Sequence, residues 1–187
     1  GDTHEEQLPT DKPGMRGRRP LRGICAVEGV AYACGMGRQV YSRHDENDWR
    51  ALDKGARPEA GDTRVVGFEA IAGFTHDEIY AAGWEGEIWS YDGKRWLQED
   101  SPTSHVLTAL CCAGDDSVYA CGQAGTLLRG RRGAWELIAH GDTDEDFFSL
   151  AWFNDALHVA SPTAIYQLAK GQLTPVKFGK DAPDACF

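Results

Sequence analysis

The stretch Glu78-Ile-Tyr-Ala-Ala-Gly83 determines the fold, because it returns 39 residues later as Ser117-Val-Tyr-Ala-Cys-Gly122. Tyr80 and Tyr119 hold the same position in these two stretches, and His158 stands a further 39 residues along the chain. A fixed period of this length is typical of repeat architectures, in which each copy forms one supersecondary unit. The sequence therefore predicts a chain built from consecutive copies of one unit.

An earlier copy carries the same landmarks with a longer spacing. Tyr32 precedes Tyr80 by 48 residues, and Trp49 precedes Trp96 by 47 residues. One insertion of about nine residues, around residues 54–62, explains the excess over the 39-residue period. Four copies in one register are hard to explain by chance.

Within a copy, apolar residues alternate with polar ones at the period of two that indicates β-strands. In the second copy we expect strands over residues 68–73, 78–83, 87–91 and 95–99. Asp92-Gly93 predicts a two-residue hairpin turn between the last two of these strands, because Gly accepts a positive φ. Four short antiparallel strands in about 40 residues form the blade of a propeller.

The expected fold class is therefore all-β, a β-propeller of about four four-stranded blades. We expect a polar, basic arm over residues 1–20 and blades over residues 21–62, 63–103, 104–143 and 144–187. Two arrangements remain open: a closed four-bladed ring, or half of a larger ring that a second copy or further residues would complete.

The segment from Ile79 to Trp96 resembles bacterial propeller repeats of the kelch-like, BNR-like and photosystem-assembly-factor-like kinds. The resemblance covers residues 21–178 and implies the blade fold. The Gly-His and Trp-Asp signatures of WD repeats are absent, and the Asp-box of BNR repeats is only partly matched, at Asp92-Gly93 and Trp96. The resemblance therefore transfers no family-level function.

Charge and composition narrow the classes of partner. The chain has 29 acidic and 19 basic residues, a net charge of −10, which disfavours nucleic acid and favours a protein with a basic surface. No apolar run approaches the length of about 18 residues that a membrane helix needs. We therefore expect no nucleic-acid partner and no membrane partner.

The six cysteines are best explained as small apolar core residues. Cys25 and Cys112 each lie seven residues before the repeat tyrosine, and Cys34 and Cys121 lie two residues after it, where other copies have Gly or Ala. Disulfides Cys25–Cys34 or Cys112–Cys121 are the alternative. Metal-ligand spacing is missing, so we expect no metal and no cofactor, and buried thiols favour a reducing cytoplasm.

Junction loops and second-to-third turns should emerge together on one face of the ring. A large aromatic residue in such a turn, Trp84, is a candidate interface anchor, although packing on a neighbouring loop would explain it equally well. Carboxylates in these loops are usually only solvated, but together they would give one acidic docking face. The expected partner-binding residues are Trp84, Glu85, Met36, Gln123, Glu59, Asp62, Asp142, Asp144, Glu145 and Asp146.

Catalytic motifs such as Gly-x-Ser-x-Gly or HExxH are missing from the sequence. We therefore expect a non-enzymatic protein-binding module. Its size, charge and architecture suggest an immunity protein that neutralises a secreted bacterial toxin, or an assembly factor, and self-association could complete the ring. The contrasting hypothesis is a propeller enzyme or lectin that binds glycans in its central funnel.

Overall fold

The computed structural model describes residues 5–9, 19–59, 62, 64–141 and 143–177. This part of the chain forms four separate sheets, each with four antiparallel strands in sequence order. The predicted fold class is confirmed. The described part has one helical element, the three-residue 3₁₀ turn η1 (Trp84–Gly86), so none of its helices is long enough to cross a membrane.

The strands of the first two blades are β1 (Leu21–Val27), β2 (Val30–Gly35), β3 (Gln39–Asp45), β4 (Asp48–Ala51), β5 (Phe68–Thr75), β6 (Glu78–Gly83), β7 (Ile88–Tyr91) and β8 (Trp96–Glu99). Those of the last two are β9 (Leu107–Cys112), β10 (Val118–Gly122), β11 (Leu127–Arg131), β12 (Ala134–Leu137), β13 (Ser149–Phe153), β14 (Ala156–Ala160), β15 (Ile165–Ala169) and β16 (Gln172–Pro175).

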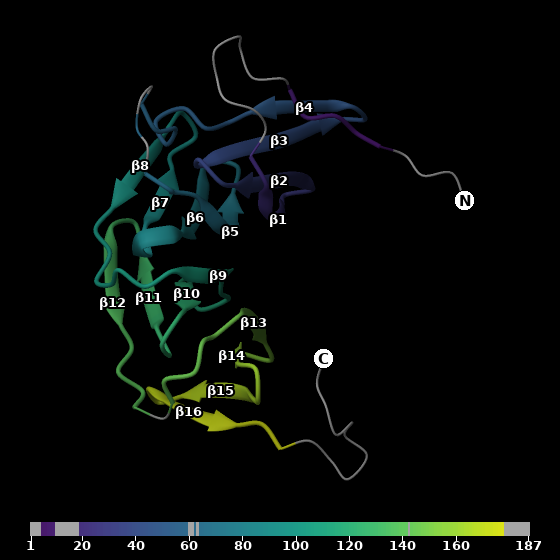
Figure 1. Cartoon of the computed structure of the whole chain (residues 1–187). Coiled ribbons are helices and arrows are strands. Elements are labelled where there is room, and N and C mark those ends of the chain that lie inside the picture. The colour runs from purple at the N-terminus through teal and green to yellow at the C-terminus, as the bar shows by residue number, and fades with distance from the viewer. Residues whose placement is uncertain (1–4, 10–18, 60–61, 63, 142, 178–187) are drawn as a thin grey trace.

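The blades follow one another around an open arc (Figure 1). The first strands β1, β5, β9 and β13 line its inner side and make the main contacts between successive blades, while β4, β8, β12 and β16 lie outermost. The first and fourth blades stand at opposite ends of the arc. Of the two arrangements that the sequence leaves open, the structure has the incomplete ring.

Apolar side chains from facing sheets hold neighbouring blades together. Phe68, Trp89 and Trp96 of the second blade are 0%, 7% and 1% exposed, and the Phe68 ring contacts both indoles. All three pack in one cluster with Cys34 and Val40 of the first blade. The Trp96 indole also donates a 2.7 Å hydrogen bond to the carbonyl of Leu52. Burial of large aromatic surfaces is the main stabilising contribution at such an interface.

In three blades the second strand ends at a glycine. The backbone that leads into the first strand of the same blade passes directly over this position and leaves no room for a side chain. A β-carbon at Gly83 would collide with the carbonyl oxygen of Gly67, and one at Gly122 with that of Val106. The fourth blade has Ser161 after its second strand.

Two local predictions are wrong. The β7–β8 connection has four residues, Asp92 to Arg95, because the Asp92 carboxylate accepts hydrogen bonds from the amides of Lys94 and Arg95. In the third blade, Cys111 rather than Cys112 takes the position of Cys25, opposite the repeat tyrosine. The first-to-second turn is longer there, so counting back from the tyrosine misplaces the first strand by one residue.

Part of the N-terminal segment lies along the outer strands of the first blade. The Glu6 carboxylate accepts hydrogen bonds from Arg43 Nε (2.8 Å) and Trp49 Nε1 (2.7 Å). Two arginines of the predicted basic arm, Arg16 and Arg18, lie outside the described residues. Arg22, in β1, forms a 3.7 Å ion pair with Glu69.

Candidate functional site

One face of the arc is built by the second-to-third turns, and we call it the loop face. In the first three blades the turn rests on the loop that enters the next blade. The amide of Gly37 donates to the carbonyl of Val66 (2.7 Å), and the amide of Gly125 donates to that of Glu145 (2.9 Å). Met36 forms a β-bridge with Gly67. These backbone bonds hold the turns in fixed positions, so the residues on them are preorganised for contact.

Trp84 lies at the start of η1 on this face and is half-buried. Its indole Nε1 donates a 2.6 Å hydrogen bond to the Glu69 carboxylate on β5. Glu85 follows it in the left-handed region, with φ of 58°, and is exposed. The indole is therefore fixed in one orientation while part of its surface remains open to solvent, as an interface anchor requires.

Basic side chains offset the expected acidity at the first two blades. Arg64 forms a 2.8 Å ion pair with Asp62 and holds the pKa of that carboxyl at about 2, well below its usual range. The hydrogen bond to Asp62 in turn raises the pKa of Arg64, and the charge of Glu85 acts in the same direction. Glu59 is exposed in the same junction loop.

A buried ion pair lies beneath this part of the loop face. The side chains of Arg38 and Glu87 are 7% and 5% exposed, and Arg38 Nε donates to Glu87 Oε2 at 2.6 Å. The indole of Trp89 donates to the same carboxylate at 3.1 Å, and the Arg38 guanidinium lies over the Trp89 ring. These contacts connect the first blade to the second.

The carboxylates between the third and fourth blades have different roles. Asp146 accepts a 2.9 Å hydrogen bond from the amide of Ala124, and Glu145 accepts one of 2.9 Å from the Thr163 hydroxyl. Asp144 is exposed, and Asp142 lies outside the described residues. Gln123 is exposed on the adjoining turn. Two of these carboxylates thus hold the loops, and Asp144 projects into solvent.

The nine described residues of this prediction consequently fall into two groups along the loop face rather than one patch. Met36, Glu59, Asp62, Trp84 and Glu85 belong to the first two blades and their junction. Gln123 and the three described carboxylates that follow His140 lie at the third and fourth blades. Among the described residues, a carboxylate of the first group, Asp62, forms an ion pair with an arginine, and no carboxylate of the second group does.

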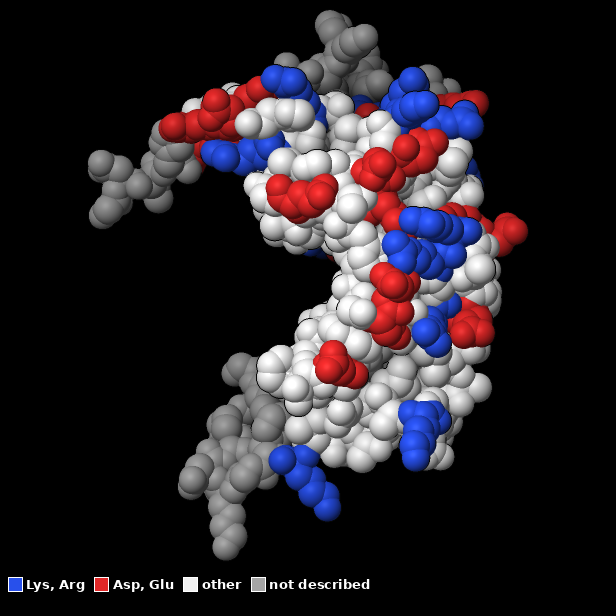
Figure 2. Space-filling view, turned by 180° about the vertical axis from the view of Figure 1, so that it is seen from behind, with Lys and Arg blue, Asp and Glu red and all other residues white. Residues whose placement is uncertain are grey.

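The charge pattern differs between the outer and inner parts of the arc. Figure 2, seen from behind, shows acidic and basic side chains interleaved along the outer part of the arc, whereas the concave edge is mostly uncharged. The net negative charge of the chain is therefore not spread evenly over its surface.

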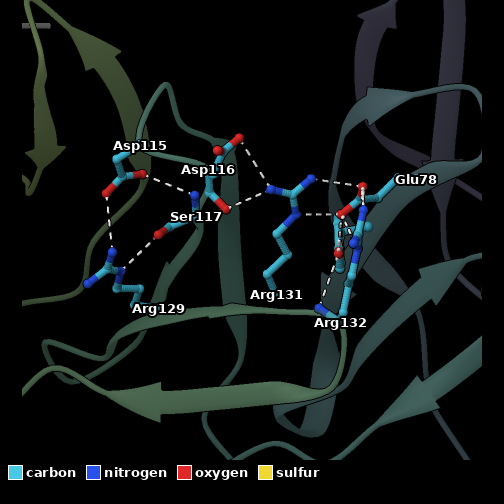
Figure 3. Close-up of polar contacts among 8 residues, drawn as sticks. Glu78, Asp115, Asp116, Ser117, Arg129, Arg131 and Arg132 are labelled. Atoms are coloured by element: carbon cyan, nitrogen blue, oxygen red, sulfur yellow. Dashed lines mark hydrogen bonds and ion pairs between the residues drawn. The ribbon is translucent and has the colours of Figure 1, made fainter.

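An ion-pair network on the opposite face was not predicted. Glu78, in the second blade, accepts from Arg131 Nε at 2.6 Å and from Arg132 Nη2 at 2.8 Å, both in the third blade, and Arg131 also pairs with Asp116 at 3.3 Å (Figure 3). The arginines hold the pKa of Glu78 at about 2. The sequence signal for this network was the pair of adjacent arginines in one turn. It could not identify their partner, because Glu78 is 53 and 54 residues away.

The described residues offer neither a reactive thiol nor a metal-binding cluster. The cysteines described there, Cys25, Cys34, Cys111, Cys112 and Cys121, are free, so the alternative disulfides are not formed. Burial raises the pKa of Cys25 to about 11 and that of Cys112 to about 12, which keeps both thiols protonated at neutral pH. Over the described ranges, no three His, Cys, Asp or Glu side chains are grouped so as to hold a metal ion.

The four sheets and their docked turns define the chain as a β-propeller-repeat protein. YCF48 bound to D1 peptide has a similar structure, with a TM-score of 0.60 and 13% identity over 84% of this chain and 54% of that chain. A protein of unknown function from Bacteroides thetaiotaomicron gives a TM-score of 0.61 and 13% identity over 84% of this chain and 43% of that one. At such identities the likeness shows the fold alone.

A much closer similarity exists to Immune protein Tsi7 of Pseudomonas aeruginosa (strain PAO1). The two are 63% identical over 187 residues, which make up 100% of this chain and 61% of that protein. The chain thus spans less than two thirds of the curated relative that it matches. No protein-family model matches the chain.

Proposed function

We propose that this chain is a non-enzymatic immunity protein, which neutralises a protein toxin by binding it. The observation that carries the proposal is the 63% identity to Immune protein Tsi7 along the whole of this chain. The net charge of −10 supports a toxin with a basic surface, because complementary charge accelerates association. A second copy of the chain is a further candidate partner.

We further propose that the toxin binds the loop face. Trp84 would provide the anchor, because its ring is half-buried and held by Glu69. Asp144 would provide an exposed charge, which forms no ion pair with the basic residues that the structure describes. The fixed backbone of the turns supports this assignment, since a preorganised surface loses little entropy on binding.

The first experiment is capture of partners by the tagged full chain from a lysate of its source organism, followed by identification and purification of the partner. The captured protein is then expressed alone and together with the chain. Growth arrest by the partner alone, relieved by the chain, is the expected result. A partner that causes no growth arrest would refute the immunity role, and failure to capture a stoichiometric partner would refute the binding module itself.

Two variants then locate the surface with the purified partner. Trp84→Ala should weaken binding by at least about 2 kcal/mol, roughly 30-fold in Kd, and Asp144→Lys should slow association most at low ionic strength. Asp77→Lys is the control, because it changes the charge equally at an exposed turn on the opposite face. Equal effects of Asp144→Lys and Asp77→Lys would contradict the loop face as the docking surface.

A further inference from the structure

The arginine of the buried ion pair beneath the loop face departs from the repeat. By strand register, Arg38 in the β2–β3 turn is equivalent to Gly86 and Gly125 in the next two blades. All three residues lie in the left-handed region, with φ of 53°, 70° and 66°. Glycine adopts this conformation freely, whereas a residue with a β-carbon is strained in it. An arginine at this position therefore indicates that its side chain has a role that offsets the strain.

The junction between the first two blades has room for this side chain. At Gly86 and Gly125 a β-carbon would meet the carbonyl oxygens of Thr103 and Thr143, because the loop into the next blade passes directly over these turns. The connection from β4 to β5 is the longest of the three between blades. Arg38 Nη1 donates a 3.5 Å hydrogen bond to the carbonyl of Ala56 in this connection. The insertion thus provides a contact for Arg38.

Glu87 also differs from its equivalents in the neighbouring blades, Gln39 and Thr126. Gln39 Nε2 donates to the carbonyl of Arg19 (2.6 Å), and Thr126 Oγ1 lies 2.8 Å from a histidine ring nitrogen in the loop before β9. Both of these partners are in the segment that enters the same blade. The Glu87 carboxylate instead accepts from Arg38 Nε at 2.6 Å, across the boundary between the first two blades. A position that elsewhere supports its own blade therefore joins two turns here.

The backbone of Glu87 closes the turn that carries Trp84. The Glu87 amide donates to the carbonyl of Trp84 (3.1 Å), and the Glu87 carbonyl accepts from the amide of Gly83 (3.1 Å). The amide of Trp84 donates to the carbonyl of Gly67 (3.0 Å), and Gly67 also forms the β-bridge with Met36. Glu87 thus has its backbone at the end of η1 and its side chain held by the β2–β3 turn of the preceding blade.

We propose that Arg38 and Glu87 are positioning residues of the docking surface, and that their ion pair sets the position of the Trp84 turn relative to the β2–β3 turn. This inference rests on the proposed function, since it assigns the pair a role in toxin binding. At 7% and 5% exposure, neither side chain can contact the toxin itself. A buried ion pair often adds little to stability, because desolvation offsets the attraction, but its directional contacts select one arrangement of the segments that it joins.

Removing both charges should preserve the fold and loosen the Trp84 turn. In the double variant Arg38→Met, Glu87→Leu no buried charge is left unpaired, but the side-chain bonds between the two turns are gone. Trp84 then occupies its binding-competent position in only a fraction of the molecules, and Kd rises by the inverse of that fraction. Association is the step that slows, because the contacts with the toxin are unchanged once the complex has formed.

The positioning of Trp84 can be measured by NMR without any partner. Its indole N–H donates to Glu69 at 2.6 Å, so the proton should exchange slowly with solvent in the wild type, and Trp84→Phe assigns the signal. The double variant should exchange this proton at least about tenfold faster. The indole proton of Trp135, which bonds to Glu99 between the second and third blades, should keep its rate. Unchanged exchange at Trp84 in the folded double variant overturns the proposal.

Binding kinetics with the purified toxin test the consequence for docking. The double variant should associate at least about tenfold more slowly and dissociate at the wild-type rate, whereas Trp84→Ala should mainly accelerate dissociation, because it removes a contact. The double variant Glu78→Leu, Arg131→Met is the matched control, since it removes an ion pair between the second and third blades on the opposite face. Wild-type association by the Arg38→Met, Glu87→Leu variant overturns the positioning role, as does an equal effect of the control.

Failure of this inference and failure of the proposed docking surface give different results. A toxin that binds Trp84→Ala as tightly as wild type refutes the loop face itself. Weak binding by Trp84→Ala with unchanged association of the double variant refutes only the positioning role. Arg38→Lys replaces the double variant if circular dichroism shows that the latter is unfolded. It retains the charge, but an ammonium group lacks the planar fork that donates to both carboxylate oxygens, so the same two changes are expected.

Discussion

Replacing Glu87 by Leu should destabilise the protein by about 3 to 5 kcal/mol, because it leaves the Arg38 guanidinium buried without a counter-charge. The two side chains are 5% and 7% exposed, so solvent cannot compensate the charge. Arg38→Met should cost a similar amount for the converse reason. The stability of a domain is about 5 to 15 kcal/mol, so either variant should lose a large fraction of it.

The double variant Arg38→Met, Glu87→Leu should be much less harmful than either single one. Both charges are then gone, and the remaining loss is about 1 to 2 kcal/mol for the unpaired Trp89 indole. The two substitutions should therefore show an interaction energy of at least about 4 kcal/mol.

Urea unfolding followed by tryptophan fluorescence measures this cycle, because Trp89 and Trp96 are buried between the first two blades. Asp48→Ala, which breaks an ion pair with Arg50 on the surface, is the matched control and should change stability little. The reasoning is refuted if either single variant costs less than about 1 kcal/mol, or if the two effects simply add.

Three further outcomes are expected. Glu78 has a pKa of about 2 in the folded protein and of about 4.3 in the unfolded chain. Its contribution to the free energy of unfolding is therefore complete above the unfolded value and is lost as pH falls toward 2. Glu78→Gln should flatten that part of an acid-unfolding profile relative to wild type. Gly122→Ala should cost at least about 1 to 3 kcal/mol in a thermal or urea melt, since its methyl group would meet the Val106 carbonyl, and unchanged stability would contradict the close approach. Burial raises the thiol pKa of Cys34 and of Cys121, so both should react with a thiol reagent far more slowly than after unfolding in urea, and equal rates would show that the blades open readily.

The blades and much of their packing could be predicted from the sequence alone. The 39-residue spacing of Tyr80 and Tyr119, with strand alternation inside each copy, was sufficient to predict four sheets and to assign Cys34 and Cys121 to small buried positions. These features are local and repeated, so each copy supports the interpretation of the others. The same reasoning located Trp84 on a turn and the junction carboxylates on loops.

How charges pair across the blades became visible in the folded structure and not before. Arg38 meets Glu87 and Arg131 meets Glu78 across blade boundaries, at separations of 49 and 53 residues, and the alternation of a strand does not encode such pairs. They depend on turn lengths and on the angle between successive sheets.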